Sequence, residues 1–282
     1  MRDGTHTNIG YGLMEKDSNP IHLGRNRVFL ASRTMQFVNE LKGKTIVVTG
    51  GARRLGKEIA LGAARAGAQV AFTWLSSAEE ASRTLAELRT TCGNALAVQC
   101  DVRDQKSIVK AMDTVLHHYG RIDVLVNNSG KYETVTMADL RPEQWDEIFA
   151  VNVRGPFLVS QYCTPALRQS KGKIINLGSL GGEKSWPDHM HYCSSKAALH
   201  MLTRTMAKAL APDIAVNCVA PGMIDLEQGR PDPEAFRRFA EQTPMKRNGA
   251  AADVVSAALY FASAPQFITG QILLVDGGLV LR

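Results

Sequence analysis

Residues 45–56 read Thr-Ile-Val-Val-Thr-Gly-Gly-Ala-Arg-Arg-Leu-Gly, and a helical pattern follows from Lys57 to Ala66. The β-branched run Thr45–Val48 favours a buried strand. A strand that turns through glycines into a helix directs backbone N–H groups and the positive end of the helix dipole at one place, where a pyrophosphate can bind. Glycine spacing alone is weak evidence, but its position after the first strand of an alternating pattern predicts a dinucleotide-binding fold.

The chain beyond this stretch alternates short apolar runs with longer helical segments, which is typical of right-handed βαβ units on a parallel sheet. We expect an α/β fold: a single doubly wound, Rossmann-type domain with a seven-stranded, mostly parallel sheet flanked by helices. The expected strands are Thr45–Val48, Gln69–Thr73, Ala95–Gln99, Val124–Val126, Lys173–Leu177, Ile214–Cys218 and Ile272–Val275. Helical patterns include Ala78–Leu88, Gln105–His118, Pro142–Val151 and Tyr192–Leu210.

The first 34 residues differ from the rest, because glycines, asparagines and Pro20 interrupt any periodicity. We interpret residues 1–34 as a mostly irregular N-terminal extension and residues 35–282 as one cofactor-binding domain. Met35 is an alternative start of the native protein. A transit peptide is a further alternative, although Asp3, Glu15 and Asp17 depart from the acid-poor composition of such peptides.

Composition argues against several classes of protein. The 282 residues include 33 lysines and arginines against 27 acidic residues, a net charge of +6, and 45% are hydrophobic. The longest apolar stretches fall short of the about 18 residues that a membrane span needs. Five cysteines without CxxC spacing indicate reduced thiols in a cytoplasmic setting, and we expect no metal site. Basic residues without interleaved aromatics do not predict nucleic-acid binding.

The end of the second expected strand indicates which dinucleotide binds. An NAD site usually places an acidic residue there, which accepts hydrogen bonds from the ribose hydroxyls. This chain has Ser76 and Ser77 instead, and the first acid, Glu79, comes too late. With Arg53 and Arg54 in the glycine loop, the pattern favours NADP(H), whose 2′-phosphate the guanidinium groups would bind. The alternative is that both arginines are solvated loop charges.

Tyr192 and Lys196 are four residues apart in an expected helix, so their side chains project from one face. A free tyrosine has a pKa of about 10, too high for ready proton exchange at neutral pH, and a nearby cation lowers that pKa. We therefore expect Lys196 to lower the pKa of Tyr192, which would act as the general acid that protonates a carbonyl oxygen as hydride arrives.

Six motifs in order carry a family resemblance. They are the glycine loop, Asn127-Asn128-Ser129-Gly130, Asn152 in Val-Asn-Val, Ser179, Tyr192-Cys193-Ser194-Ser195-Lys196, and the C-terminal pair Ile268–Gln271 and Val275–Gly278. Together they resemble the short-chain dehydrogenase/reductase (SDR) family, in particular compact members such as the 3-oxoacyl-acyl-carrier-protein reductases. The resemblance covers about Leu41 to Leu281. It implies an NADP-dependent enzyme (EC 1.1.1.-) that interconverts a carbonyl and an alcohol, most directly a 3-oxoacyl thioester or related ketone.

The resemblance also implies roles for individual residues. Lys196 would hold the nicotinamide ribose, Asn152 would anchor a water for proton relay, and Ser179 would hydrogen-bond the substrate oxygen and the developing alkoxide. Catalytic residues would thus be Asn152, Ser179, Tyr192 and Lys196. Cofactor-binding residues would be Gly50, Arg53, Arg54, Leu55, Gly56, Ser76, Asp101, Val102, Asn127, Tyr192, Lys196, Pro221, Gly222 and Ile224.

Within the cofactor set, Asp101 and Val102 would contact the adenine and Asn127 the adenosine ribose, while Pro221, Gly222 and Ile224 would flank the nicotinamide. Asp101 could equally be a helix N-cap. Substrate would contact Ser179, Tyr192 and Trp186. The segments Leu180–His191 and Met223–Lys246 would shape its site, although Trp186 could simply pack as a loop hydrophobe.

Two residues depart from the family pattern. Arg54 stands where the family usually has its middle glycine, and this arginine form resembles the pteridine reductases, so a pterin is an alternative substrate. Those enzymes, however, characteristically have aspartate at the position of Ser179. Leu226 stands where many relatives have a threonine that bonds the cofactor carboxamide.

Two further expectations concern class and assembly. A non-catalytic NADP-sensing or scaffold protein is the alternative from another class, and the intact catalytic set counts against it. The resemblance implies a homotetramer or homodimer built through helices near Pro142–Ser170 and the C-terminal strand.

Overall fold

Seven parallel strands form the central sheet, in the order β3-β2-β1-β4-β5-β6-β9. The computed structural model describes residues 41–226 and 233–282, so the expectations for residues 1–34 and for Met35 lie outside the described residues. The strands are β1 (Thr45–Val48), β2 (Gln69–Trp74), β3 (Ala95–Gln99), β4 (Val124–Asn127), β5 (Lys173–Leu177), β6 (Ala215–Pro221) and β9 (Ile272–Val275). This confirms the predicted Rossmann-type sheet; the largest difference in bounds is at β6, which continues to Pro221.

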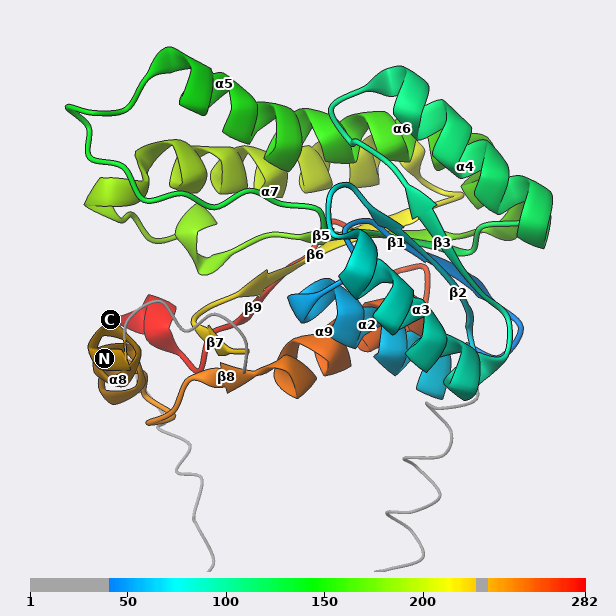
Figure 1. Ribbon diagram of the computed structural model, residues 1–282. Coiled ribbons are helices and arrows are strands. Elements are labelled where there is room, and N and C mark those ends of the chain that lie inside the picture. The colour runs from blue at the N-terminus through cyan, green and yellow to red at the C-terminus, as the bar shows by residue number, and fades with distance from the viewer. Residues whose placement is uncertain (1–40, 227–232) are drawn as a thin grey trace, which may run out of the picture. The chain divides into compact units, whose positions relative to one another are not determined.

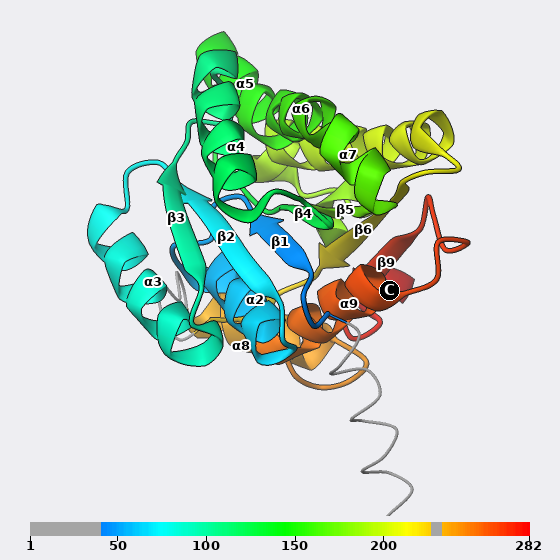
Figure 2. The same cartoon turned by 90° about the vertical axis from the view of Figure 1, so that its right-hand side faces the viewer.

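Helices cover both faces of the sheet (Figure 1). One face carries α4 (Gln105–Tyr119), α5 (Pro142–Phe149), α6 (Gly155–Ser170) and α7 (Met190–Leu210), and the other carries α2 (Arg54–Arg65), α3 (Ala78–Cys92) and α9 (Ala251–Ser263). Figure 2 shows the same two layers from the side. Each face of the sheet packs on its helices through a separate hydrophobic core, and strand β1 contributes to both. Ile46 and Val48 face the α2/α9 layer, while Val47 faces the α4/α6 layer.

The segment from Pro142 to Ser170 is one helical path interrupted by a π-helical turn, Ala150–Arg154. The predicted end of the first helix at Val151 falls inside this turn. Asn152 is fully buried there. Such turns are rare and occur frequently at functional sites.

Shorter elements follow the carboxyl ends of β5 and β6. The 3₁₀ turns η2 (Leu180–Gly182) and η3 (Pro187–His189) connect β5 to α7. After β6 come β7 (Ile224–Asp225), α8 (Pro233–Gln242) and β8 (Gly249–Ala250), and β7 pairs with β8. The C-terminal turn η4 spans Leu279–Leu281. In the part of the chain that the structure describes, no helix is long and apolar enough to cross a membrane.

The sheet has its topological switch point between β1 and β4. Strand β1 pairs with β2 on one side and with β4 on the other, and the connections from β1 and β4 lead to helices on opposite faces. In open α/β sheets, ligands bind at the carboxyl ends of the strands beside this point. The glycine loop after β1 lies at that position.

Candidate active site

The turn after β1 has no space for side chains at two of its glycines. Gly50 adopts a φ of +65°, which L-residues rarely adopt. A Cβ atom on Gly56 would lie 2.4 Å from the Gly50 carbonyl oxygen. The backbone therefore closes tightly at the N-terminus of α2, as a pyrophosphate site requires.

Arg54 adopts a backbone conformation that favours glycine. Its φ is +52°, in the left-handed region. Arg53 and Arg54 are both exposed, and no other side chain in residues 41–226 or 233–282 pairs with either guanidinium. Two cations thus stand at the mouth of the loop. Leu55, by contrast, is partly buried and packs against the α2/α9 core.

Asn128 and Thr49 anchor the glycine loop to the end of β4. Asn128 Nδ2 donates to the carbonyl oxygens of Thr49 and Gly50, at 2.9 and 3.0 Å. Thr49 Oγ1 accepts from the backbone N–H groups of Asn128 and Ser129, both at 3.0 Å. Sequence reasoning quoted Asn128 within its motif but gave it no role.

The ends of β2 and β3 carry the residues expected around the adenosine. Ser76 is exposed, and Asp101 binds Arg103, whose Nη2 lies 2.7 Å from Asp101 Oδ2. This pairing lowers the pKa of Asp101. The alternative of Asp101 as helix N-cap is wrong, because Asp104 caps α4 by accepting from the Lys106 N–H. Val102 is buried against Gly155, where a Cβ atom would lie 3.0 Å from Val102 Cγ2.

The Asn127 side chain is buried beneath the site. Its Nδ2 donates to Ser160 Oγ at 3.0 Å and to Asn176 Oδ1 at 2.9 Å, and in the described part of the chain its Oδ1 has no hydrogen-bond partner. Asn176 in turn donates to Thr203 on α7. A contact of Asn127 with ribose, as the resemblance implies, would therefore have to use its backbone.

Ser179 and Tyr192 meet across the gap between the end of β5 and α7. Ser179 is the N-cap of η2, where its Oγ accepts from the Gly181 N–H at 3.0 Å, and its hydroxyl lies near enough to the Tyr192 phenol to affect the phenol's pKa. Burial raises the pKa of Tyr192 to about 12, while the Ser179 hydroxyl acts in the opposite direction. The expectation of a lowered pKa is wrong here, because desolvation of the phenolate outweighs every stabilising neighbour.

Lys196 lies one turn further along α7. Its Nζ donates to the Leu177 carbonyl oxygen at 2.7 Å and lies 5.8 Å from the centre of the Tyr192 ring. Lys196 is 5% exposed, and burial lowers its pKa to about 8. A pKa of 8 leaves the ammonium mostly protonated at neutral pH.

Asn152 joins these residues through the segment after β4. Its Oδ1 accepts from the Lys131 N–H at 2.8 Å, while its Nδ2 donates to the Lys131 carbonyl at 2.9 Å and to Ser195 Oγ at 3.0 Å. A Cβ atom on Gly130 would lie 3.6 Å from Asn152 Oδ1 and 3.8 Å from Lys196 Nζ, so both side chains border Gly130. The four expected catalytic residues therefore lie together.

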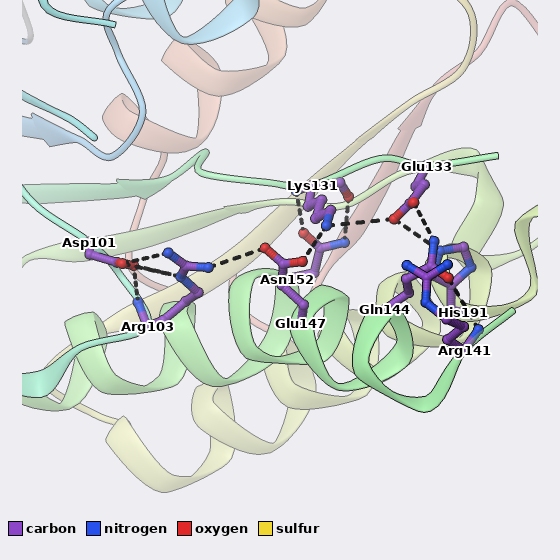
Figure 3. Close-up of polar contacts among 9 residues, drawn as sticks. All are labelled: Asp101, Arg103, Lys131, Glu133, Arg141, Gln144, Glu147, Asn152 and His191. Carbon is purple, nitrogen blue, oxygen red and sulfur yellow. Dashed lines mark hydrogen bonds and ion pairs between the residues drawn. The ribbon is translucent and has the colours of Figure 1, made fainter. Parts of the chain in front are cut away.

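A chain of charges runs alongside this cluster (Figure 3). Glu147 on α5 accepts from Arg103 at 3.1 Å and from Lys131 Nζ at 2.5 Å. Lys131 is also 3.6 Å from Glu133, whose Oε2 lies 4.0 Å from the buried ring of His191. This series of ion pairs links Asp101, where adenosine is expected, to Lys131, which holds Asn152.

Aromatic rings surround the exposed edge of Tyr192. Tyr132 meets Tyr192 edge-on at 4.9 Å and stacks on His189, also at 4.9 Å. Trp186 lies 5.9 Å from His189, and a Cβ atom on Gly181 would lie 2.9 Å from the Trp186 ring. Tyr132 is 59% exposed and was missed in the sequence, where an aromatic residue two positions after the Asn-Asn-Ser-Gly motif was the only signal.

The residues expected at the nicotinamide lie at the carboxyl end of β6. Pro221 pairs with Val275, and the Gly222 N–H donates to the Val275 carbonyl at 3.0 Å. Ile224 begins β7 and packs against the α2/α9 core. Leu226 directly precedes residues 227–232, so six of the 24 residues in the expected substrate segment Met223–Lys246 lie outside the described residues.

The fold and this cluster define a Rossmann-type oxidoreductase that uses a nicotinamide cofactor, and comparisons with known proteins agree. A family described as Enoyl-(Acyl carrier protein) reductase matches residues 50–280. The 3-oxoacyl-acyl-carrier-protein reductase FabG of Staphylococcus epidermidis is 34% identical over 243 residues, which cover 84% of this chain and 99% of the relative.

Solved structures give the same result. A gluconate 5-dehydrogenase from Burkholderia cenocepacia, in complex with NADP and tartrate, superposes with a TM-score of 0.82 at 30% identity, covering 88% of this chain and 99% of that one. A putative short-chain alcohol dehydrogenase from Sinorhizobium meliloti also has a TM-score of 0.82 at 30% identity, covering 87% and 99% of the two chains. The chain belongs to the short-chain dehydrogenase/reductase family.

Proposed function

We propose that this protein is an NADP(H)-dependent carbonyl reductase, with a 3-oxoacyl thioester or a related ketone as substrate. The observation that carries the proposal is the grouping of Ser179 and Tyr192 with the buried ammonium of Lys196, whose Nζ lies 5.8 Å from the centre of the Tyr192 ring. The curated FabG relative supports the substrate class. The chain retains all four expected catalytic residues, Asn152, Ser179, Tyr192 and Lys196. This argues against a non-catalytic sensor or scaffold, which would tolerate their loss.

The proposed chemistry follows from the pKa values of the site. NADP(H), when bound, supplies the hydride. Ser179 and Tyr192 would bind the carbonyl oxygen, and Tyr192, with a pKa of about 12, holds its proton at neutral pH and can donate it to the forming alkoxide. The Lys196 cation would stabilise the phenolate that remains. Asn152 connects through Ser195 Oγ to the Tyr192 backbone, and we assign it the water-anchoring role in proton return.

The glycine loop supports NADP(H) over NAD(H). Its closed backbone fits a pyrophosphate, and the exposed guanidinium groups of Arg53 and Arg54 fit a 2′-phosphate, which the strand end at Ser76 does not repel. The NADP complex of the Burkholderia structure is consistent with this choice. Binding of NADPH and NADH measured by calorimetry tests it, and tighter binding of NADH would refute it.

A pterin is the second candidate substrate. The aromatic cluster of Tyr132, His189 and Trp186 beside Tyr192 favours it, since such rings stack on planar heterocycles. A screen of NADPH oxidation against 3-oxoacyl thioesters, ketoesters, quinones, enoyl thioesters and dihydropterins separates the two proposals. Turnover of dihydropterin alone would replace the ketone assignment, and turnover of the enoyl thioester alone would overturn both.

We further propose a homotetramer or homodimer. A surface hollow between α4 and α6 is lined by Val109, Leu158, Tyr162 and Ala166, and Phe157 on α6 is 42% exposed. Light scattering at micromolar concentration tests this, and a species near the chain mass of 30.7 kDa would contradict it. All five cysteines are free thiols, which supports the proposed cytoplasmic setting.

A further inference from the structure

His200 is a buried histidine that the proposed mechanism does not use. It follows Lys196 by one turn of α7 and is 1% exposed. Its Nδ1 lies 2.9 Å from Glu183 Oε1, and its Nε2 has no hydrogen-bond partner within residues 41–226 and 233–282. Because a carboxylate only accepts hydrogen bonds, Nδ1 carries the proton of the neutral ring. Burial lowers the pKa of His200, which keeps the ring neutral at pH 7.

The ring fills a space that two glycines leave open. A Cβ atom on Gly178 would lie 2.4 Å from His200 Nε2, and one on Gly182 would lie 2.5 Å from His200 Cε1. Gly178 directly precedes Ser179, and Gly182 ends the η2 turn that Ser179 begins. The imidazole therefore touches the backbone on both sides of Ser179.

One face of α7 thus holds the Ser179 segment at successive turns. Tyr192 packs against the turn, because a Cβ atom on Gly181 would lie 3.3 Å from Tyr192 Cε1, and Lys196 donates to the carbonyl of Leu177. His200 contacts Gly178 and Gly182 and binds Glu183 just beyond the turn. A displacement of about 1 Å in such a group can reduce turnover by about a hundredfold, so this third support matters for catalysis.

We propose that His200 is a positioning residue, whose ring, held by Glu183, sets the place of Ser179 Oγ relative to the Tyr192 phenol. The inference rests on the proposed carbonyl reduction, in which Ser179 binds the substrate oxygen. It adds a residue one turn beyond the Tyr192-Lys196 pair to the parts that determine turnover.

A double-mutant cycle tests the proposal. His200→Ala should lower kcat by about ten- to a hundredfold, with little change in NADPH affinity. In a Ser179→Ala background the same change should have almost no further effect, because the group it positions is gone. Equal losses of kcat in both backgrounds would overturn the proposal.

Four further variants separate positioning of Ser179 from general damage to the fold. Gly182→Ala places a methyl group against the ring and should reproduce the loss in kcat. Met206→Ala, on the same helix but in the α4/α6 core, is the matched control and should lower stability without this loss. His200→Asn retains a donor at the Nδ1 position, so its kcat should lie between those of His200→Ala and the wild type. A wild-type kcat in His200→Phe would show that the hydrogen bond to Glu183 is dispensable, and this result would contradict the proposal.

Amide hydrogen exchange distinguishes failure of this inference from failure of the proposed function. If the wild-type protein reduces no carbonyl compound, the function is wrong, yet faster exchange at residues 180–183 in His200→Ala would still support the ring's structural hold on the turn. If the wild type is active and His200→Ala changes neither exchange nor kcat, the inference alone fails.

Discussion

The glycine loop after β1 and the cluster of Ser179, Tyr192, Lys196 and Asn152 hold their polar groups in opposite environments. At the loop, Arg53 and Arg54 are exposed and have no side-chain partner in the described residues. At the cluster, Lys196 and Asn152 are buried and bonded to the chain's own carbonyl and amide groups. Under the proposed function, the anion would be bound by exposed cations that water still surrounds. Proton transfer would instead use groups that are buried and held in place by hydrogen bonds.

Removal of the Tyr192 phenol should have the largest effect, and it should affect turnover without affecting the glycine loop. Tyr192→Phe deletes the proton donor, and we expect kcat for ketone reduction to fall by about 10³-fold or more. Because the cofactor loop is untouched, NADPH affinity measured by calorimetry should stay within about threefold, which corresponds to less than 1 kcal/mol. Substantial remaining turnover would refute the acid role.

Lys196→Met should separate function from stability. We expect kcat to fall by about a hundredfold through loss of the cation beside Tyr192. At pH 7 the variant should be about 1–3 kcal/mol more stable in urea unfolding, because the wild type then keeps a desolvated charge. Burial lowers the pKa of Lys196 from 10.5 to about 8, so the unfolded chain binds more protons between these values.

The stability of the wild type should consequently rise between pH 8 and 10.5, and the advantage of Lys196→Met should shrink over the same range. A constant difference across this pH range would show that the lysine is not buried as described. The pH dependence of stability therefore tests the burial of Lys196 without an activity assay.

Substitutions in the glycine loop test the role of its two exposed arginines. Arg53→Ala and Arg54→Ala should each raise the KM for NADPH about tenfold and leave the KM for NADH nearly unchanged. Arg54→Gly should lose the same affinity but gain up to about 1 kcal/mol of stability, since glycine relieves the left-handed backbone. Arg54→Ala is its matched control, because it removes the guanidinium and keeps the strain. Equal effects on NADH and NADPH would contradict phosphate binding.

The smallest effect is expected where the two regions are linked. Glu147→Gln weakens the contacts with Arg103 and Lys131, which are partly exposed, so kcat should change by less than about fivefold and less still in high salt. The control is Glu241→Gln, which breaks an exposed pair with Arg237 on α8. A loss beyond about tenfold would mean that the charge chain holds Asn152 more firmly than partly exposed pairs normally do.

Much of the fold was predictable because its signals are local. The β-branched residues at Thr45–Val48 predict a strand, and the glycines that follow predict the loop, without reference to any distant residue. Tyr192 and Lys196 were predictable as a pair, because helical spacing alone puts them on one face.

Other features depend on partners distant in sequence. Burial sets the direction of the Tyr192 pKa, and the packing around its ring includes Tyr132, a residue sixty positions earlier in the chain. The space for His200 is made by glycines on another element. Arg54 in a left-handed conformation contradicts its own propensity, so the backbone there follows the tight closure of the loop rather than the residue.

The π turn at Ala150–Arg154 fixes the rotational phase of everything that follows it in α6. Each residue advances an α-helix by about 100°, so the one extra residue turns Val159, Cys163 and Leu167 by that angle relative to Ile148. All four are buried, so both stretches of this helical path turn apolar side chains to the core. Deleting a single residue from the turn would rotate the apolar stripe of α6 by about 100°, so outside Asn152 this segment should accept substitutions more readily than changes of length.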